Sequence, residues 1–233
     1  MNPDLQDSYL THLRQDLDAF AGCLGADLST PVEHCGDWTL YDLADHHGRG
    51  SLWTVAAITE RRGDHQPPPA PRDPGALRTW FDDATNQLAS ALSVDPATRA
   101  WTIYPPPTVG FWRRRRCLEA LVHRWDAEHA LAMATPIDSE LAVDGIAEVV
   151  DTMAPRQIQS GRAAEPQHAV RFAATDTGGS WVLGPGDPVA TASAAAADLL
   201  LMLWGRLPKH GTAIRWDGDA EAAQAALSES LVP

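Results

Sequence analysis

Residues 109–134 read VGFWRRRRCLEALVHRWDAEHALAMA, and the spacing of their apolar side chains predicts one long helix. Within this segment Glu119 and His123 stand four residues apart. On a helix, that spacing puts both side chains on one face, where they can reach a single point roughly 6 Å from either backbone. The pair therefore has the spacing of two ligands of one metal ion. The apolar contacts of the helix are expected from Phe111, Leu118, Leu121, Val122, Trp125 and Leu131.

Three more helices are predicted before this one. Residues 5–24 keep apolar side chains at steps of three and four. Thr39 is followed three residues later by Asp42, a variant of the capping box that opens a helix running to about residue 61. Residues 73–92 form the third, because an aspartate can cap this helix and a proline can occupy its first turn. Together these segments predict a helical bundle.

The pattern changes after a fifth helix, which is expected from residue 136 to about 153. Around residues 160–167 the helical spacing stops, and beyond them short strands alternate with helices. We therefore predict an α+β fold, with a helical bundle in residues 1–160 and a small α+β domain in residues 165–233. The expected elements of this domain are strands at 168–173, 181–183, near 189 and at 212–216, and helices at 195–204 and 219–231.

Composition narrows the class of partner. The chain has 233 residues, and its 18 Lys and Arg side chains against 31 Asp and Glu give a formal net charge of −13. Such an excess of negative charge disfavours non-specific electrostatic binding to nucleic acid or to an anionic membrane surface. We therefore expect a small-molecule partner, with no nucleic acid and no membrane.

Cysteine use and the N-terminal residues indicate the compartment. Cys23, Cys35 and Cys117 are an odd and widely spaced set, which argues against a disulfide framework. Each is expected to be a small buried hydrophobic side chain. Residues 1–9 lack the basic and apolar regions of a secretory signal, and residues 189–204 are too short to span a bilayer. The predicted location is the cytoplasm.

A third metal ligand is expected from the second helix. His46 lies on the same helical stripe as Leu43, Gly50 and Trp53 and should therefore face the interior of the bundle. Gly50 leaves space one turn further on for a ligand or a partner helix. Two histidines and one glutamate with an open coordination position are the arrangement that a catalytic divalent metal needs.

Other interpretations of these residues stay open. His47, Asp126 and His129 are nearby alternative ligands, although His47 sits about 100 degrees around the helix from His46. Alternatively, His46 is a core histidine bonded to a carbonyl group, and the glutamate and histidine of the long helix form an ordinary pair at its solvated edge.

Four arginines, Arg113 to Arg116, cover a full helical turn, so they cannot all point at one ligand. Most of the run is expected on a solvated or inter-domain face. Arg116 is the exception, because it shares a face with Glu119 and His123. There its guanidinium could clamp a substrate carboxylate with two hydrogen bonds.

Common cofactor and hydrolase motifs are missing from the sequence. It contains no P-loop, GxSxG or HExxH motif, and no GxGxxG after a predicted strand. Nucleotide cofactors and the common hydrolase and zincin sites therefore find no support.

Three segments carry a resemblance to a known family. They are GDWTLYDLADH at residues 36–46, EALVHRWDAE at residues 119–128 and DLLLMLWGR at residues 198–206. On these segments the chain resembles the mycothiol-dependent maleylpyruvate isomerase family, over nearly its whole length. The resemblance implies a DinB-like, metal-binding four-helix bundle followed by the small C-terminal α+β domain of that family.

The resemblance also implies a functional site. In the family, two histidines and one glutamate hold a divalent metal, usually zinc, and by motif these fall on His46, Glu119 and His123. An arginine of the Leu-Trp-Gly-Arg segment, here Arg206, is implied to act at the site as a catalytic residue. Arg116 or Arg206 is then expected to hold the carboxylate of a substrate.

The implied chemistry uses mycothiol, a low-molecular-weight thiol, and a small electrophilic substrate. A thiol on the metal loses its proton and becomes a nucleophile near neutral pH, so no protein cysteine is required. In the isomerase the thiolate is implied to add to a cis double bond, allow rotation and leave, whereas related members resemble S-transferases. Two alternatives are a non-enzymatic small-molecule-binding protein that kept the fold, and a hydrolase in which the metal activates water.

Overall fold

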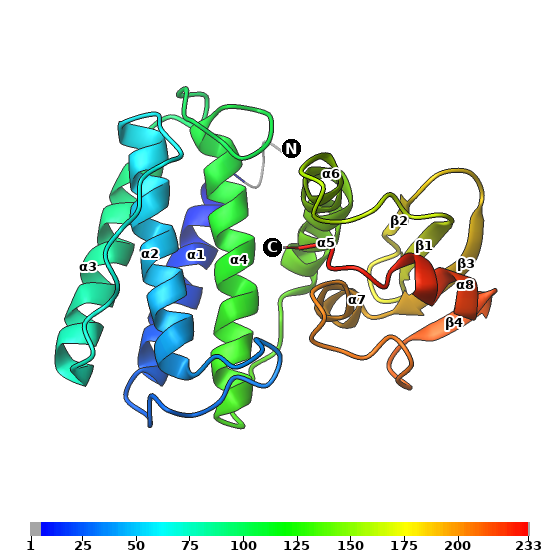
Figure 1. Ribbon diagram of the computed structural model, residues 1–233, viewed down its shortest axis with the longest axis horizontal. Coiled ribbons are helices and arrows are strands. Elements are labelled where there is room, and N and C mark those ends of the chain that lie inside the picture. The colour runs from blue at the N-terminus through cyan, green and yellow to red at the C-terminus, as the bar shows by residue number, and fades with distance from the viewer. Residues whose placement is uncertain (1–5, 233) are drawn as a thin grey trace. The chain divides into compact units, whose positions relative to one another are not determined.

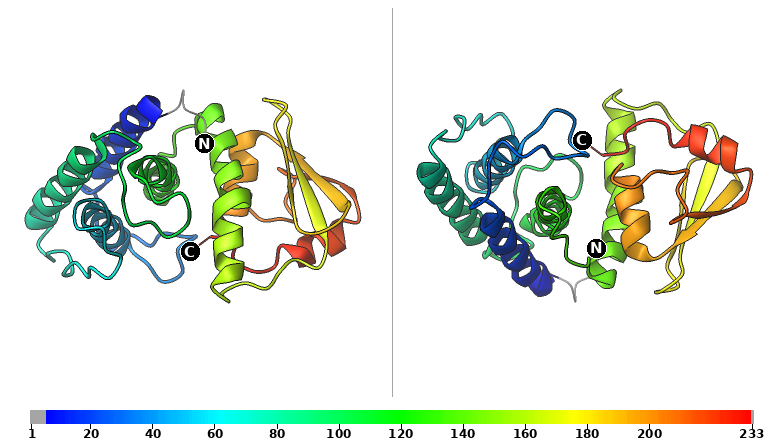
Figure 2. Two further views of the ribbon diagram at one scale, coloured as in Figure 1. Left: turned by 90° about the horizontal axis from the view of Figure 1, so that it is seen from above. Right: turned by 90° about the horizontal axis from the view of Figure 1, so that it is seen from below.

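Four helices form the first unit of the structure, a computed structural model that describes residues 6–232 (Figure 1). Figure 2 looks nearly along these helices and shows them as a bundle. The bundle predicted from the sequence is confirmed, and Leu5, the first residue of the predicted first helix, lies outside the described residues. The helices are α1 (Gln6–Cys23), α2 (Leu40–Thr59), α3 (Pro74–Leu92) and α4 (Val109–Ala130).

Capping hydrogen bonds confirm the predicted starts of two helices. Before α2, the Thr39 backbone N–H donates to the Asp42 carboxylate at 2.9 Å, and the Asp42 N–H donates to the Thr39 hydroxyl at 3.4 Å. Before α3, the Asp73 carboxylate accepts from the Ala76 N–H at 2.9 Å. These bonds satisfy backbone donors that the first turn of a helix leaves without partners. The start of α2 fixes the rotation of this helix, and so it determines which of its residues face the neighbouring helices.

The packing of the bundle centres on α4. α1 packs along α4, and α2 packs along α3 and also contacts α4. Phe20 of α1 and Phe81 of α3 stack with their ring centroids 5.1 Å apart, and Trp112 of α4 is buried. α4 ends at Ala130 rather than at the predicted residue 134, because Ala132 has a left-handed backbone conformation with φ of 56°.

The second unit combines a four-stranded sheet with helices, which confirms the predicted α+β class. Its elements are α5 (Ser139–Glu148), the π-helix η2 (Val149–Met153), α6 (Ala154–Gln159), β1 (Ala169–Ala174), β2 (Ser180–Leu183), β3 (Pro188–Ala194), α7 (Ala196–Leu203), β4 (Arg215–Gly218) and α8 (Ala220–Ala226). The strand order is β2-β1-β3-β4, with β1 and β3 parallel and the two outer pairs antiparallel. α7 packs on α5 and on the central strands, and α8 packs on β3.

Two predicted boundaries in this unit change for local reasons. The helix expected to end near residue 153 continues through the π-helical turn into α6. Pro155 lacks an N–H and its ring would clash with the carbonyl four residues earlier, and a wider turn accommodates it. β4 spans Arg215–Gly218 instead of 212–216. Gly218, at φ of 99°, lets β4 approach β3 where a Cβ would come within 2.5 Å of the Val189 carbonyl oxygen.

The last helix is also shorter than predicted. α8 ends at Ala226, and the residues expected to extend it to 231 form an irregular tail instead. Leu231 and Val232 are buried in that tail, and the Val232 carbonyl accepts from the Gln157 side chain at 2.9 Å. No helix within residues 6–232 is long and apolar enough to cross a membrane.

The division between the two units follows Thr135, earlier than the boundary predicted near residue 160. The cause is the packing of α5 against α7. A Cβ added to Gly145 of α5 would lie 2.8 Å from a methyl carbon of Leu200 on α7, so the two helices approach closely. α5 therefore shares its core with the second unit, although its helical pattern resembles that of the bundle.

Candidate functional site

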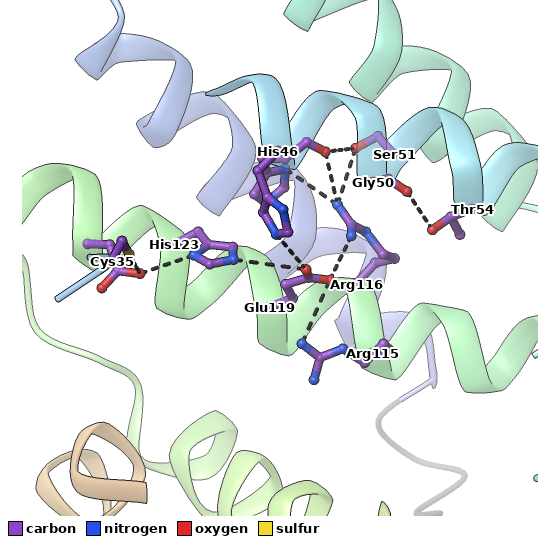
Figure 3. Close-up of polar contacts among 11 residues, drawn as sticks. Cys35, His46, Gly50, Ser51, Thr54, Arg115, Arg116, Glu119 and His123 are labelled. Carbon is purple, nitrogen blue, oxygen red and sulfur yellow. Dashed lines mark hydrogen bonds and ion pairs between the residues drawn. The ribbon is translucent and has the colours of Figure 1, made fainter. Parts of the chain in front are cut away.

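Three predicted ligands meet in the bundle. His46 comes from α2, and Glu119 and His123 come from α4 (Figure 3). The Glu119 Oε1 atom lies 3.5 Å from His46 Nε2 and 3.9 Å from His123 Nε2. One ligand atom from each residue lies within 4.8 Å of the other two. Ligand atoms around a tetrahedral zinc are separated by about 3.3 Å, so the three residues fit one divalent ion with small adjustments.

His46 lies at the edge of the bundle, which corrects the prediction that it faces the interior. Its side chain is 41% exposed, and the Trp38 ring lies beside it at a centroid distance of 4.9 Å. The interior position is taken by its neighbour His47, which contacts the rings of Phe20 and Phe81. Burial, with the charge of a nearby arginine, holds the pKa of His47 well below its usual value. The cluster is therefore open to solvent on the His46 side.

Arg116 orients the Glu119 carboxylate. Its Nη1 donates to Glu119 Oε2 at 2.6 Å, while Nη2 donates to the His47 carbonyl at 3.2 Å and to the Ser51 hydroxyl at 3.3 Å. Gly50 provides the space for this guanidinium, because a Cβ there would lie 2.9 Å from Nη1. The space predicted beside Gly50 thus holds a side chain of the protein, and Oε1 of Glu119 faces the two histidines.

The arginine run is more deeply buried than predicted. Arg113, Arg115 and Arg116 are each at most 4% exposed, so of the two predicted settings, a solvated or an inter-domain face, the solvated one is wrong for them. Arg113 donates to the Leu92 carbonyl and to the Val94 carbonyl, both at 2.9 Å, and so satisfies acceptors at the end of α3. A long charged side chain can be buried when each donor finds an acceptor.

Asp126 forms a hydrogen bond with the ring nitrogen of His123 that faces away from the cluster. Its Oδ2 atom lies 3.0 Å from His123 Nδ1, and its side chain is fully buried. A carboxylate on Nδ1 fixes the ring and leaves Nε2 as the ligand atom. Cys35 donates its S–H to the same carboxylate at 3.6 Å and is only half-buried, unlike the buried apolar cysteine predicted. The sequence indicates Asp126 only as an alternative ligand, although its spacing of three from His123 is typical of a residue that supports a ligand.

The electrostatics of the cluster favour the protonation states that a metal needs. Burial by itself raises the pKa of Glu119, but the guanidiniums of Arg116 and Arg115 outweigh burial and hold this pKa well below its usual value. Burial lowers the pKa of His123, and the hydrogen bond to Asp126 opposes part of that shift. A carboxylate and a neutral imidazole are therefore present at neutral pH, as metal coordination requires.

Two other predicted residues lie outside this cluster. His129, an alternative ligand, points its Nε2 at Glu33 at 3.2 Å. Arg206 follows α7 in the second unit, where its Nη1 donates to the Trp204 carbonyl at 2.7 Å and its guanidinium lies 5.6 Å from the centroid of the Trp204 ring.

Comparisons with known proteins agree with this architecture. Residues 10–128 match the family model described as the mycothiol maleylpyruvate isomerase N-terminal domain. The chain belongs to the mycothiol-dependent maleylpyruvate isomerase family. Residues 140–225 match the MDMPI C-terminal domain, so the family relationship extends over both units. A search of curated proteins gives no match.

Solved structures with the fold of this family resemble the chain. A crystal structure of mycothiol-dependent maleylpyruvate isomerase superposes with a TM-score of 0.65 at 15% sequence identity, covering 91% of this chain and 92% of that chain. A mutant of that enzyme in which a histidine is replaced by alanine gives a TM-score of 0.64 with the same identity and coverage. At this identity the likeness shows the fold, and the chemistry rests on the site itself.

Proposed function

We propose that this family member is a metal- and mycothiol-dependent enzyme that acts on a small electrophilic substrate. The observation that carries the proposal is the convergence of one carboxylate oxygen and two imidazole nitrogens, contributed by α2 and α4, within 4.8 Å of one another. Three protein ligands leave a fourth position for an exogenous group, which is typical of catalytic rather than structural zinc.

The residues present fit a divalent metal, with zinc as the expected ion. His46, Glu119 and His123 would hold it, and the ligand types suit zinc better than the all-oxygen sets that magnesium and calcium prefer. A metal held there would lower the pKa of a bound thiol, so that mycothiol supplies a thiolate nucleophile near neutral pH.

The surrounding residues keep the ligands in place. Arg116 holds one oxygen of Glu119 and so directs the other toward the histidines. Asp126 holds the proton of His123 on Nδ1, which keeps Nε2 available. The exposed edge of His46 leaves a path from solvent to the cluster. We assign no nucleophilic role to a protein cysteine, because the thiol is supplied by mycothiol.

The substrate is expected to carry a carboxylate next to an activated double bond or another electrophilic centre. Two reactions use the same nucleophile: cis–trans isomerisation, in which the thiolate adds and then leaves, and S-transfer, in which it stays on the product. The family name favours isomerisation of maleylpyruvate. Because both Nη atoms of Arg116 are engaged within the bundle, we assign Arg116 to Glu119 and retain Arg206 as the candidate that holds the substrate carboxylate.

A turnover assay with four combinations of cofactor tests this proposal. Zinc-loaded and metal-free protein are each incubated with maleylpyruvate, with and without mycothiol, and isomerisation is followed by absorbance. The proposal predicts turnover only when both zinc and mycothiol are present, and its loss in His123→Ala but not in His168→Ala, an exposed histidine of the second unit.

Other results of this assay favour the alternatives. Zinc-dependent consumption of ester or amide substrates without thiol would support a hydrolase. If saturable binding of maleylpyruvate occurs without turnover of this substrate or of a panel of thiol-reactive electrophiles, the protein is a binder that kept the fold.

A further inference from the structure

A second group of ligating side chains lies in the bundle and has no role in the function proposed above. Glu33 and His34 belong to the connection between α1 and α2, and His129 lies in the last turn of α4. One ligand atom from each lies within 4.8 Å of the other two. We propose that Glu33, His34 and His129 form a second divalent-metal site.

The ring spacing of this group is similar to that of the first, although its two imidazoles are stacked at 26° and those of the first group meet at 85°. The rings of His34 and His129 have their centroids 5.5 Å apart, compared with 5.3 Å for His46 and His123. His129 Nε2 lies 3.2 Å from Glu33 Oε2. That is close to the separation of about 3.3 Å between ligand atoms around a tetrahedral zinc.

The two groups cannot share an ion. His123 and His129 both lie on α4 but are six residues apart in the sequence. On an α-helix this places them about 9 Å apart along the axis and about 120 degrees apart around it. An ion bound by Nε2 of one ring is therefore out of reach of the other ring, and two separate ions are required.

Aromatic stacking holds the two imidazoles before any metal binds. The Trp125 ring stacks on His129, one turn further along α4, with a centroid distance of 4.5 Å and an interplanar angle of 10°. The Trp125 ring also lies against His34 at 6.0 Å and 23°. Ligands that are already positioned lose less conformational freedom on binding, which favours affinity.

Backbone pairing joins the two ends of the chain segment that carries Glu33 and His34. Pro31 pairs with Thr39 in an isolated bridge, and the Val32 backbone N–H donates to the Trp38 carbonyl at 2.8 Å. Val32 is also buried, which fixes the start of the turn. The glutamate and histidine are thus presented from a turn whose two ends are tied together.

Charge and ligand type indicate which ions the site would take. It lies at the C-terminal end of α4, where the helix dipole favours a cation. Two imidazoles and one carboxylate suit zinc, nickel, cobalt or copper rather than magnesium or calcium. The side chains of Glu33 and His129 are 71% and 38% exposed, so we expect weaker binding than at the first site, where Glu119 and His123 are only 15% and 6% exposed. A bound ion would tie the α1–α2 connection to the end of α4.

Equilibrium dialysis of the full chain against zinc chloride tests the proposal. We expect two ions per wild-type chain, one in His129→Ala, one in His123→Ala and none in the double variant. His34→Ala and Glu33→Gln should weaken the second ion by tenfold or more and leave the first unchanged. His168→Ala, the exposed control, should bind two ions. Circular dichroism checks that each variant is folded.

The outcomes separate this proposal from the first site. A wild-type chain that binds one ion, lost in His123→Ala and kept in His129→Ala, overturns the second site and leaves the first intact. A second ion that persists in both His34→Ala and His129→Ala places it elsewhere and also overturns the proposal. If His123→Ala fails to fold, the single variants Glu33→Gln and His129→Ala, both at partly exposed residues, still decide the question.

Discussion

Arg116 binds one oxygen of the Glu119 carboxylate at 2.6 Å and leaves the other oxygen to the two histidines. The guanidinium is itself fixed, because its second nitrogen donates to the His47 carbonyl and the Ser51 hydroxyl of α2. One arginine thus links the two helices that supply the candidate ligands and selects the oxygen that faces the proposed metal position. A direct consequence is that metal affinity should depend on residues that do not touch the metal.

Replacing Arg116 with lysine should weaken zinc binding. A lysine ammonium keeps the charge but cannot donate to Glu119 and to α2 in the same planar geometry. Loss of a partner behind a metal ligand typically lowers affinity about 10- to 100-fold, and we expect Arg116→Lys to fall in this range. Competition with a chromophoric chelator measures it. Arg62→Ala, which removes an exposed arginine, is the control and should bind zinc like the wild type.

Gly50→Ala tests the space that holds Arg116. Alanine in a helix interior is by itself more favourable than glycine by about 1 kcal/mol. Its Cβ would, however, meet Arg116 Nη1 at 2.9 Å and push the guanidinium from Glu119. Because the loss of a hydrogen bond between buried charged groups outweighs that gain, we predict a lower free energy of unfolding together with reduced zinc affinity. Urea unfolding and chelator competition measure the two effects, and a variant unchanged in both would argue against this arrangement.

Arg206 should affect turnover and not metal content. The arginine and the three ligands lie in different units, so removal of Arg206 leaves the ligand cluster unchanged. Arg206→Ala should lower kcat/KM about 100-fold or more if its guanidinium holds the substrate carboxylate, and Arg206→Lys should recover only part of that loss. Unchanged kcat/KM in both variants, measured with a confirmed substrate, would exclude a role of Arg206 in substrate binding and leave it only the contacts with Trp204.

Asp16 should make stability depend on pH. Burial, opposed in part by Arg124, raises the pKa of Asp16 from 3.8 to about 6. A carboxyl whose pKa is raised on folding adds stability below pH 3.8, and this contribution is lost as the pH rises through 6. Relative to Asp16→Asn, the wild type should lose at most about 3 kcal/mol of unfolding free energy between pH 4 and 7. Urea unfolding at both pH values measures this, and a constant difference between the two proteins would contradict it.

Local patterns predicted the parts of the bundle and site that depend on neighbours in the sequence. The spacing of Thr39 and Asp42 located the start of α2, and the spacing of Glu119 and His123 placed both ligands on one face of α4. The family motif pointed to His46 as the third candidate ligand, whereas the helix spacing placed this residue in the interior of the bundle. The pairing of Glu119 with His123 needs only the periodicity of a helix.

The errors came from packing between distant segments. The phase of α2 against its neighbours decides that His47 rather than His46 is interior, and hydrophobicity alone does not separate two adjacent histidines. Arg113 is buried because the end of α3 offers carbonyl acceptors, which the sequence of α4 does not show. The division at Thr135 depends on the contact of α5 with α7, between residues that are far apart in the chain.

X-ray absorption spectroscopy of zinc-loaded His129→Ala reports the ligands of the first site alone, because that variant is expected to hold zinc only there. If His46, Glu119 and His123 hold a zinc ion that binds mycothiol, the spectrum shows two imidazole nitrogens and one carboxylate oxygen at about 2.0–2.2 Å, and a sulfur neighbour at about 2.3 Å appears when mycothiol is added. The same spectrum with and without mycothiol, or a zinc shell without imidazole nitrogens, would contradict it.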